Sequence, residues 1–290
     1  MLTIKAPAKI NWFLEILGKR PDGYHEIETV MQAIDLYDEI TVSGRTDSEL
    51  VLECDINLGD PKQNLVYRAA EILQQAHAPG RGAQIALKKR IPHGAGLGGG
   101  SSDAANALNA LNRLWQLNLH KNVLRDIVSQ VGSDCAFFVE AGTALCTGRG
   151  EIVRQLQDVV GLNLVILYPE DVCPTGTVYS DLSRHLTSER RDCYLFHDLP
   201  DELHMEELKL AVFNRLQESA LRVSKRLSQV WAETANEQDV VVRFVSGSGS
   251  SIGFLVADRQ SAERLADSFR TRALGQAYAV KTLPRGEVWG

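Results

Sequence analysis

The feature that most constrains this chain is a glycine-rich turn between a predicted strand and a predicted helix. Five glycines fall within the seven residues Gly94 to Gly100, between a strand expected over Ala83 to Ile91 and a helix expected to begin near Ser102. Glycines in such a turn adopt positive φ and let a bulky ligand approach the main chain. The N–H groups of the turn and of the helix N-terminus favour anions, so the stretch predicts a phosphate-binding loop.

Three known phosphate-binding loops compete with a simple linker as explanations of this stretch. A P-loop is excluded because it needs a lysine after its last glycine, and no lysine occurs between Lys89 and Lys121. The dinucleotide pattern Gly-x-Gly-x-x-Gly matches, but the acidic strand end that it requires about 20 residues on would fall at Leu119-His120, between two predicted helices. The protein-kinase loop lacks its His-Arg-Asp and Asp-Phe-Gly partners. A flexible linker is disfavoured because a strand and a strongly patterned helix lie so close on either side.

Charge and cysteine usage exclude other classes of function. The 290 residues carry 31 Lys and Arg against 37 Asp and Glu, a net charge of −6, which argues against a general nucleic-acid or anionic-membrane binder. A local site for a small anion is still compatible with this balance. The five cysteines form no Cys-x-x-Cys pair and no cluster with histidines, so we expect reduced thiols and no structural zinc. Neither a signal peptide nor an apolar run of about 18 residues is found, and we expect a cytoplasmic protein.

Hydrophobic periodicity divides the chain into two parts near residue 160, and the length suits about two domains. We therefore expect one domain over residues 1–160 and a second over 161–290. In the first, strands are expected over 10–17, 39–42 and 50–53, together with a helix capped by Asn64. Two further helices are expected over 104–115 and 123–131. The helix over 104–115 has Asn106 and Asn109 on its polar face. In the second, strands are expected over 162–167, 240–245 and 252–256, long helical stretches over 206–231 and a helix over 261–270.

Several segments together resemble the GHMP kinases, the family of galactokinase and of the homoserine, mevalonate and phosphomevalonate kinases. The residues Gly96-Leu97-Gly98-Gly99-Gly100-Ser101-Ser102-Asp103-Ala104-Ala105, with a proline four positions before them, are similar to the family's ATP-binding loop. Pro7 to Asn11 resembles its first motif and Gly247 to Ser251 its last. Arg20 to Ile27 and Gly132 to Phe138 narrow the resemblance to members that act on a cytidine-diphosphate-linked alcohol of isoprenoid biosynthesis. The motifs occur in the expected order over most of the chain.

The resemblance implies a fold, a reaction and cofactors. The implied fold is a two-domain α/β (α+β) GHMP kinase fold, with an N-terminal half like domain 2 of ribosomal protein S5, a ferredoxin-like C-terminal half, and the site in the cleft between them. The implied reaction is ATP-dependent phosphorylation of the C2 hydroxyl of 4-diphosphocytidyl-2-C-methyl-D-erythritol, with Mg²⁺ carried by ATP and no protein metal ligand predicted. The alternatives are a homoserine- or mevalonate-type kinase and, from another class, a non-catalytic nucleotide-binding protein.

The same resemblance assigns the ATP-binding and catalytic residues. The implied ATP-binding residues are Pro92, His93, Gly94, Ala95, Gly96, Leu97, Gly98, Gly99, Gly100, Ser101 and Ser102. Asp134 precedes an apolar run, where a carboxylate can accept a hydroxyl proton if a cation keeps it ionised. Lys9 is the cation that the resemblance supplies. Considered alone, Asp134 could equally cap a helix and Lys9 could be a solvated strand residue.

A second group of residues is implied for the substrate. Tyr24 and His25 follow a Pro-Asp-Gly turn, and their rings can stack on a nucleobase or hydrogen-bond its edge. The resemblance implies that they hold cytosine, with Asn11 nearby and Tyr179 as a second aromatic wall, whereas a surface tyrosine and a solvated histidine are the plain alternatives. Gly247 and Gly249 are implied to lie near the transferred phosphate. The chain departs from the family in having Ala136 where proline is common.

Overall fold

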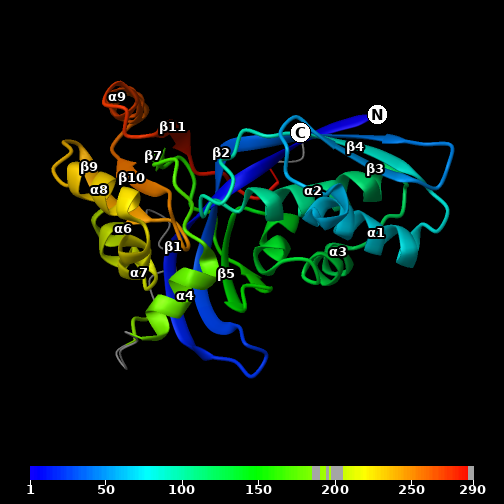
Figure 1. Cartoon of the computed structure of the whole chain (residues 1–290), viewed down its shortest axis with the longest axis horizontal. Coiled ribbons are helices and arrows are strands. Elements are labelled where there is room, and N and C mark those ends of the chain that lie inside the picture. The colour runs from blue at the N-terminus through cyan, green and yellow to red at the C-terminus, as the bar shows by residue number, and fades with distance from the viewer. Residues whose placement is uncertain (185–189, 194–195, 197–204, 287–290) are drawn as a thin grey trace.

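A long antiparallel pair of strands runs through the molecule and organises both of its halves (Figure 1). The computed structural model describes residues 1–184, 190–193, 196 and 205–286. Strands β1 (Leu2–Lys19) and β2 (His25–Gly44) pair from Leu2↔Val42 to Lys19↔His25, with three register shifts along the way. The turn between them contains the predicted Pro-Asp-Gly sequence.

The first sheet has seven strands. Their order is β3-β4-β2-β1-β8, and β5 and β6 extend it from β2. The remaining strands are β3 (Leu50–Cys54), β4 (Ala83–Lys88), β5 (Thr143–Gly148), β6 (Ile152–Gln155) and β8 (Phe213–Asn214). Helices α1 (Leu65–His77), α2 (Gly99–Leu114) and α3 (Lys121–Val128) gather on one side of it (Figure 1), with the short 3₁₀ helices η1 (Pro61–Gln63) and η2 (Ser133–Val139). Apolar side chains of the sheet and these helices form one continuous core.

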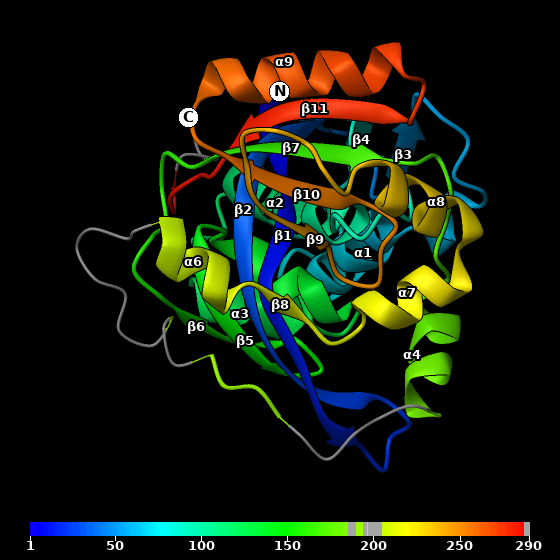
Figure 2. The same ribbon diagram turned by 90° about the vertical axis from the view of Figure 1, so that its left-hand side faces the viewer.

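The second sheet has four antiparallel strands in the order β11-β7-β10-β9 (Figure 2). They are β7 (Asn163–Tyr168), β9 (Val240–Val245), β10 (Ile252–Val256) and β11 (Gln276–Lys281). Helices α4 (Thr175–Ser183), α6 (Met205–Ala211), α7 (Gln217–Val223), α8 (Lys225–Glu233) and α9 (Arg259–Thr271) accompany them. Numbered along the chain, the strands lie in the order 4-1-3-2, which is the ferredoxin-like arrangement expected for this half.

The two sheets are joined by a strand and by a shared core. Strand β8, from the C-terminal half, pairs in parallel with β1 through Phe13↔Phe213 and Leu14↔Asn214. The indole of Trp12 in β1 lies 5.4 Å from the ring of Phe244 in β9, within a core cluster drawn from both sheets. The expected boundary near residue 160 falls between β6 and β7, although β8 crosses it.

Several expected elements are confirmed. Asn64 caps α1 through its side chain, which accepts a hydrogen bond from the Val66 N–H at 2.9 Å. The strands over 240–245 and 252–256 have the predicted bounds.

In the part of the chain that the structure describes, no helix is both long and apolar enough to cross a bilayer.

Other expectations are wrong, for reasons of tertiary packing. Helix α2 begins at Gly99 rather than near Ser102, because Gly98 takes the N-cap position with φ of 71°. The polar side chains of Asn106 and Asn109 on α2 are buried, so this helix has no exposed polar face over its first three turns. The expected helical stretch over 206–231 is divided into α6, α7 and α8 by strand β8 and short breaks. Strands β5, β6 and β11 were not predicted.

Candidate active site

The glycine-rich turn runs from the end of β4 to Gly98 and is held between the two sheets. Gly94, Gly96 and Gly98 all have positive φ, at 67°, 77° and 71°. The backbone N–H of Lys9 donates to the carbonyl of Leu97 at 2.9 Å, and the N–H of Ser251 donates to that of Ala95 at 3.1 Å. Strand β1 thus holds one carbonyl of the turn, and the turn after β9 holds another.

A second glycine-rich turn, residues 246–251, lies between β9 and β10. The first turn lies against it at Gly96. A Cβ atom added there would lie 2.2 Å from the carbonyl oxygen of Ser246, so a side chain at this position has no space. Gly247 faces the same region, where its Cβ would meet Lys9 Nζ at 3.3 Å. Gly249 instead faces Val245 and its surroundings, and it is absent from the cavity walls described below. Of the two glycines predicted near the transferred phosphate, Gly247 therefore lines the larger cavity and Gly249 lines neither cavity.

Lys9 and Asp134 meet beside the turn. The Lys9 Nζ atom lies 3.4 Å from Asp134 Oδ2, and their side chains are 5% and 30% exposed. Lys9 comes from β1, and Asp134 is the second residue of η2. The Lys9 ammonium thus places a positive charge beside the carboxylate, and the exposed fraction of Asp134 leaves room for a ligand.

A chain of buried hydrogen bonds fixes the lysine from the other side. Asn11 Oδ1 accepts from Lys9 Nζ at 2.6 Å, and Asn11 Nδ2 donates to Thr29 Oγ1 at 2.8 Å. The Thr29 hydroxyl in turn donates to the carbonyl of Phe13 at 2.7 Å. Both ends of the Asn11 amide are therefore engaged within the protein. This arrangement orients Lys9, a function that the sequence did not suggest for Thr29.

A large cavity of about 820 Å³ opens above this ion pair. Lys9, Asn11 and Asp134 line it together with Gly94, Gly96, Gly98 and Gly247. Its lining also includes Tyr24, His25, Tyr179, Lys19 and Arg149. The cavity thus brings the predicted catalytic and substrate residues to one space of the size usual for small-molecule ligands.

Aromatic and basic side chains also meet in this cavity. The rings of His25 and Tyr179 lie 4.8 Å apart with an interplanar angle of 31°, and the Arg149 guanidinium lies 4.8 Å above the ring of Tyr24. Burial, and to a smaller extent the charge of Lys19, lowers the pKa of His25, so its imidazole is neutral at pH 7. Burial, followed by the charge of Asp134, raises the pKa of the Tyr179 hydroxyl, which therefore stays protonated.

A second cavity, of about 370 Å³, lies against the glycine-rich turn. Gly94, Gly96 and Gly98 line both cavities, so the backbone of the turn borders both spaces. The second cavity is also lined by Pro92, His93, Ala95, Gly99, Gly100 and Ser101, and by Asn64, Leu65, Lys89 and Asp103 among others.

Two predicted residues of the turn do not line either cavity. Leu97 is buried in the core between the sheets. Ser102 is fully buried inside α2, where its Oγ accepts from Asn106 Nδ2 at 3.3 Å. Its position follows from the helix beginning at Gly99, which turns Ser102 inward and leaves Ser101 at the cavity wall.

Comparison with known proteins now gives the family. The GHMP kinases N terminal domain matches residues 64–142. The 4-diphosphocytidyl-2-C-methyl-D-erythritol kinase of Pelotomaculum thermopropionicum is 36% identical over 271 residues, covering 93% of this chain and 94% of the relative. The protein of that name from Listeria monocytogenes is 35% identical over 294 residues, covering 99% and 97%. This chain belongs to the 4-diphosphocytidyl-2-C-methyl-D-erythritol kinase family.

Solved structures agree with this assignment. A crystal structure of 4-(cytidine 5'-diphospho)-2C-methyl-D-erythritol kinase matches with a TM-score of 0.79 at 32% identity, covering 97% of this chain and 99% of that one. A homoserine kinase from Cytophaga hutchinsonii matches with a TM-score of 0.72 at 15% identity over 98% and 95%, and so shares the fold. As a member of this family the chain is an ATP-dependent kinase with a small-molecule substrate.

The sequence missed several residues that line the site. Lys19 and Arg149 border the larger cavity, and Asn64 borders the smaller one. A signal for Arg149 was present in Gly148-Arg149-Gly150, where a charged residue stands between two glycines of positive φ. Asn64 was recognised only as a helix cap, because its second position, beside the glycine-rich turn, depends on the tertiary fold.

The Asn11–Thr29 chain yields a test of how Lys9 is oriented. Thr29→Val keeps the shape of the side chain but leaves the buried Asn11 amide without its acceptor. Such a loss costs about 1–3 kcal/mol, and we expect kcat to fall about tenfold while KM for ATP stays unchanged. Thr29→Ser retains the hydroxyl and serves as the matched control in steady-state kinetics. Equal kcat values for the two variants would contradict the assigned role.

Proposed function

We propose that this chain transfers the γ-phosphoryl group of ATP to the C2 hydroxyl of 4-diphosphocytidyl-2-C-methyl-D-erythritol. One observation carries the proposal: the backbone of the glycine-rich turn lines two cavities, and the Lys9–Asp134 pair lines the larger of them. Phosphoryl transfer requires its two substrates to meet at one point, with the donor phosphate in line with the acceptor oxygen. The names of the relatives favour the same donor and acceptor. The use of ATP is also our reason for proposing a cytoplasmic location.

ATP would lie along the glycine-rich turn. Its phosphates would accept hydrogen bonds from the turn and from the N-terminus of α2 at Gly99, where unpaired N–H groups and the helix dipole favour negative charge. The nucleoside would occupy the smaller cavity, beside Asn64 and Leu65. The ATP-binding role of His93, which lines this cavity, stays part of the proposal.

The donor atoms around the turn fit a magnesium ion that arrives with ATP. In the described residues there is no group of three or more histidine, cysteine or acidic side chains suited to hold a metal. Mg²⁺ prefers oxygen ligands and is commonly held through substrate phosphates and waters with few protein groups. The Ser101 hydroxyl at the wall of the smaller cavity is the group that we propose to face it. When bound, Mg²⁺ supplies neutralisation of the phosphate charge.

The acceptor would lie in the larger cavity, with its cytosine end at His25 and Tyr179. A neutral imidazole presents one donor and one acceptor nitrogen, which suits the edge of a base, and aromatic rings suit its face. Tyr24 would cover the base from the solvent side, since it is 52% exposed. The cations of Lys19 and Arg149 line the same wall and would face the diphosphate. At the other end, the alcohol would reach Asp134.

The chemistry then follows from the Lys9–Asp134 pair. Asp134 accepts the proton of the C2 hydroxyl while the hydroxyl oxygen bonds to the γ-phosphorus and the bond from that phosphorus to the β–γ bridging oxygen breaks. The ammonium of Lys9, 3.4 Å from Asp134 Oδ2, would hold the carboxylate in position for this transfer. ADP leaves with the electron pair of the broken bond. Asn11, whose amide is engaged by Lys9 and Thr29, keeps the ammonium in place.

The two-domain division is part of the same proposal. We propose that residues 1–160 form the ATP-binding domain and 161–290 the second domain. The larger cavity is lined by both parts, since Lys9 and Asp134 come from the first and Tyr179 and Gly247 from the second. A site shared in this way would respond to any change in how the parts pack.

The alternatives differ in what they require of the cavity. Homoserine and mevalonate carry no base, so a kinase for either would have no use for the His25–Tyr179 contact. A non-catalytic nucleotide-binding protein would have no use for a carboxylate and an ammonium beside the phosphates, and this chain has both.

An acceptor panel tests the proposed substrate. ADP release is measured with ATP and Mg²⁺ in the presence of the diphosphocytidyl compound, homoserine, mevalonate or no acceptor. We expect turnover only with the diphosphocytidyl compound. Turnover with homoserine or mevalonate and none with that compound would overturn the assignment, and ATP binding without turnover of any acceptor would favour the non-catalytic alternative.

Substitution of Asp134 tests the proposed base. Asp134→Asn preserves the shape of the side chain but cannot take the proton, so we expect kcat to fall by about 10²-fold or more. Binding of ATP, followed by calorimetry, should be retained because the turn is untouched. A near-normal kcat in this variant would remove Asp134 from the role.

A further inference from the structure

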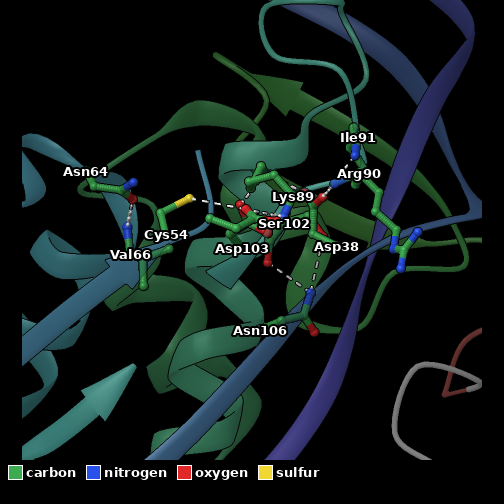
Figure 3. A network of polar contacts seen from close by, with 11 residues as sticks. Asp38, Cys54, Asn64, Val66, Lys89, Arg90, Ile91, Ser102, Asp103 and Asn106 are labelled. Atoms are coloured by element: carbon green, nitrogen blue, oxygen red, sulfur yellow. Dashed lines mark hydrogen bonds and ion pairs between the residues drawn. The ribbon is translucent and has the colours of Figure 1, made fainter. Parts of the chain in front are cut away.

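A buried ionic cluster lies directly behind the glycine-rich turn and takes no part in the chemistry proposed above (Figure 3). The ammonium of Lys89 is paired with the carboxylates of Asp38 and Asp103, the latter at 2.5 Å. Their side chains are 5%, 0% and 2% exposed. The three residues come from three places in the chain: β2, the residue after β4, and the second turn of α2.

The cluster is attached to both ends of the turn. The second carboxylate oxygen of Asp38 accepts hydrogen bonds from the backbone N–H groups of Arg90 and Ile91, at 2.5 and 2.9 Å. These residues lead into the turn. Asp103 belongs to the helix that leaves it. Lys89 therefore ties the incoming and outgoing segments to each other and to the central strand β2.

The start of α2 is also packed onto this cluster. A Cβ at Gly99 would lie 3.1 Å from Ile91 Cγ2 and 3.4 Å from Asp38 Oδ2, so the first residue of the helix rests on the anchored segment. The middle of the turn is held separately, by the backbone hydrogen bonds of Leu97 and Ala95 described above. The polar contacts that hold its two ends therefore come from β2, Lys89 and α2.

Burial makes this cluster costly unless all three charges stay together. Burial raises the pKa of Asp103 to about 7, with a contribution from Asp38, while Lys89 opposes the shift. For Lys89 itself burial acts to lower the pKa, but the two carboxylates outweigh it and the pKa is raised, so the ammonium stays charged. Apolar side chains of similar volume commonly stabilise a core as well as a buried ion pair does or better. Stability alone does not account for the cluster.

We propose that Asp38, Lys89 and Asp103 are positioning residues that set the backbone of the glycine-rich turn for the phosphates of ATP. The inference rests on the proposed placement of ATP along the turn. Lys89 and Asp103 reach the wall of the smaller cavity, but their side chains are only 5% and 2% exposed, and the two ion pairs occupy the Lys89 ammonium. Their effect would pass through the N–H groups that the phosphates meet, because a small displacement of such groups weakens binding strongly.

An uncharged triple variant separates positioning from stability. Asp38→Asn, Lys89→Met and Asp103→Leu together remove all three charges, while the amide oxygen introduced at position 38 can still accept from the backbone of residues 90 and 91. We expect this variant to fold, with a melting temperature equal to or above that of the unaltered protein. We expect its affinity for ATP to fall by about tenfold or more, and by a clearly larger factor than its affinity for adenosine, which lacks the phosphates. Calorimetry with each ligand gives both numbers.

Two controls make the outcome decisive. Asp55→Asn changes an exposed carboxylate that accepts from the Lys89 backbone N–H at 2.9 Å, outside the cluster, and should leave both affinities unchanged. A second control is Lys89→Met alone, followed by hydrogen exchange. Relative to the unaltered protein, its exchange rate should rise more in residues 90–98 than in α1. Undiminished ATP affinity in a folded triple variant would overturn the inference, as would an equal loss for ATP and adenosine. Failure of the unaltered protein to bind ATP would instead contradict the proposed function.

Discussion

The close approach of two backbones at Gly96 is the constraint on which the rest of this structure depends. There the first glycine-rich turn lies against the carbonyl of Ser246, with no space for a side chain. Because the two turns come from different sheets, this contact fixes where the N-terminal and C-terminal parts meet. It also brings Gly247 beside Lys9, and both residues line the larger cavity.

The proposed site needs no basic surface to bind a polyanion. The chain carries a net charge of −6, yet the groups that we propose for phosphate binding are backbone N–H groups of a turn and a helix N-terminus, which are independent of net charge. Of the cations that line the larger cavity, Lys9 is paired with Asp134, and Arg149 lies over Tyr24. Charge is therefore placed locally, where the reaction needs it, and the global balance excludes only general binding to polyanions.

Local signals predicted those parts of the fold that local interactions determine. Asn64 was recognised as a cap from its own chemistry, and the strands on either side of Gly247 to Ser251 from their apolar runs and the glycines between them. The helix start at Gly99 was missed because it depends on Gly98, which takes the N-cap position with positive φ where a Cβ would be crowded by Phe138 and Lys9. The break of the 206–231 helical region has the same origin, since β8 exists only through its pairing with β1.

The site was predictable to the extent that its residues belong to recognisable motifs. Lys9, Asp134, His25 and Tyr179 all line one cavity, although their roles stay predictions. Thr29, Asp38 and Lys89 carry no such signal, and Asp103 was noted only as a member of the glycine-rich motif. Their partners come together only in the tertiary fold. The burial of Ser102 likewise follows from where α2 begins.

The central claim is that the glycine-rich turn separates two ligands that are bound at the same time. Calorimetry tests it directly, by titrating cytidine 5′-diphosphate into the protein saturated with a non-hydrolysable ATP analogue and Mg²⁺. The account predicts that one equivalent of the cytidine nucleotide still binds, because its base and diphosphate enter the larger cavity while the analogue fills the smaller one. Loss of this binding at saturating analogue would contradict the account, since the two nucleotides would then share a single site.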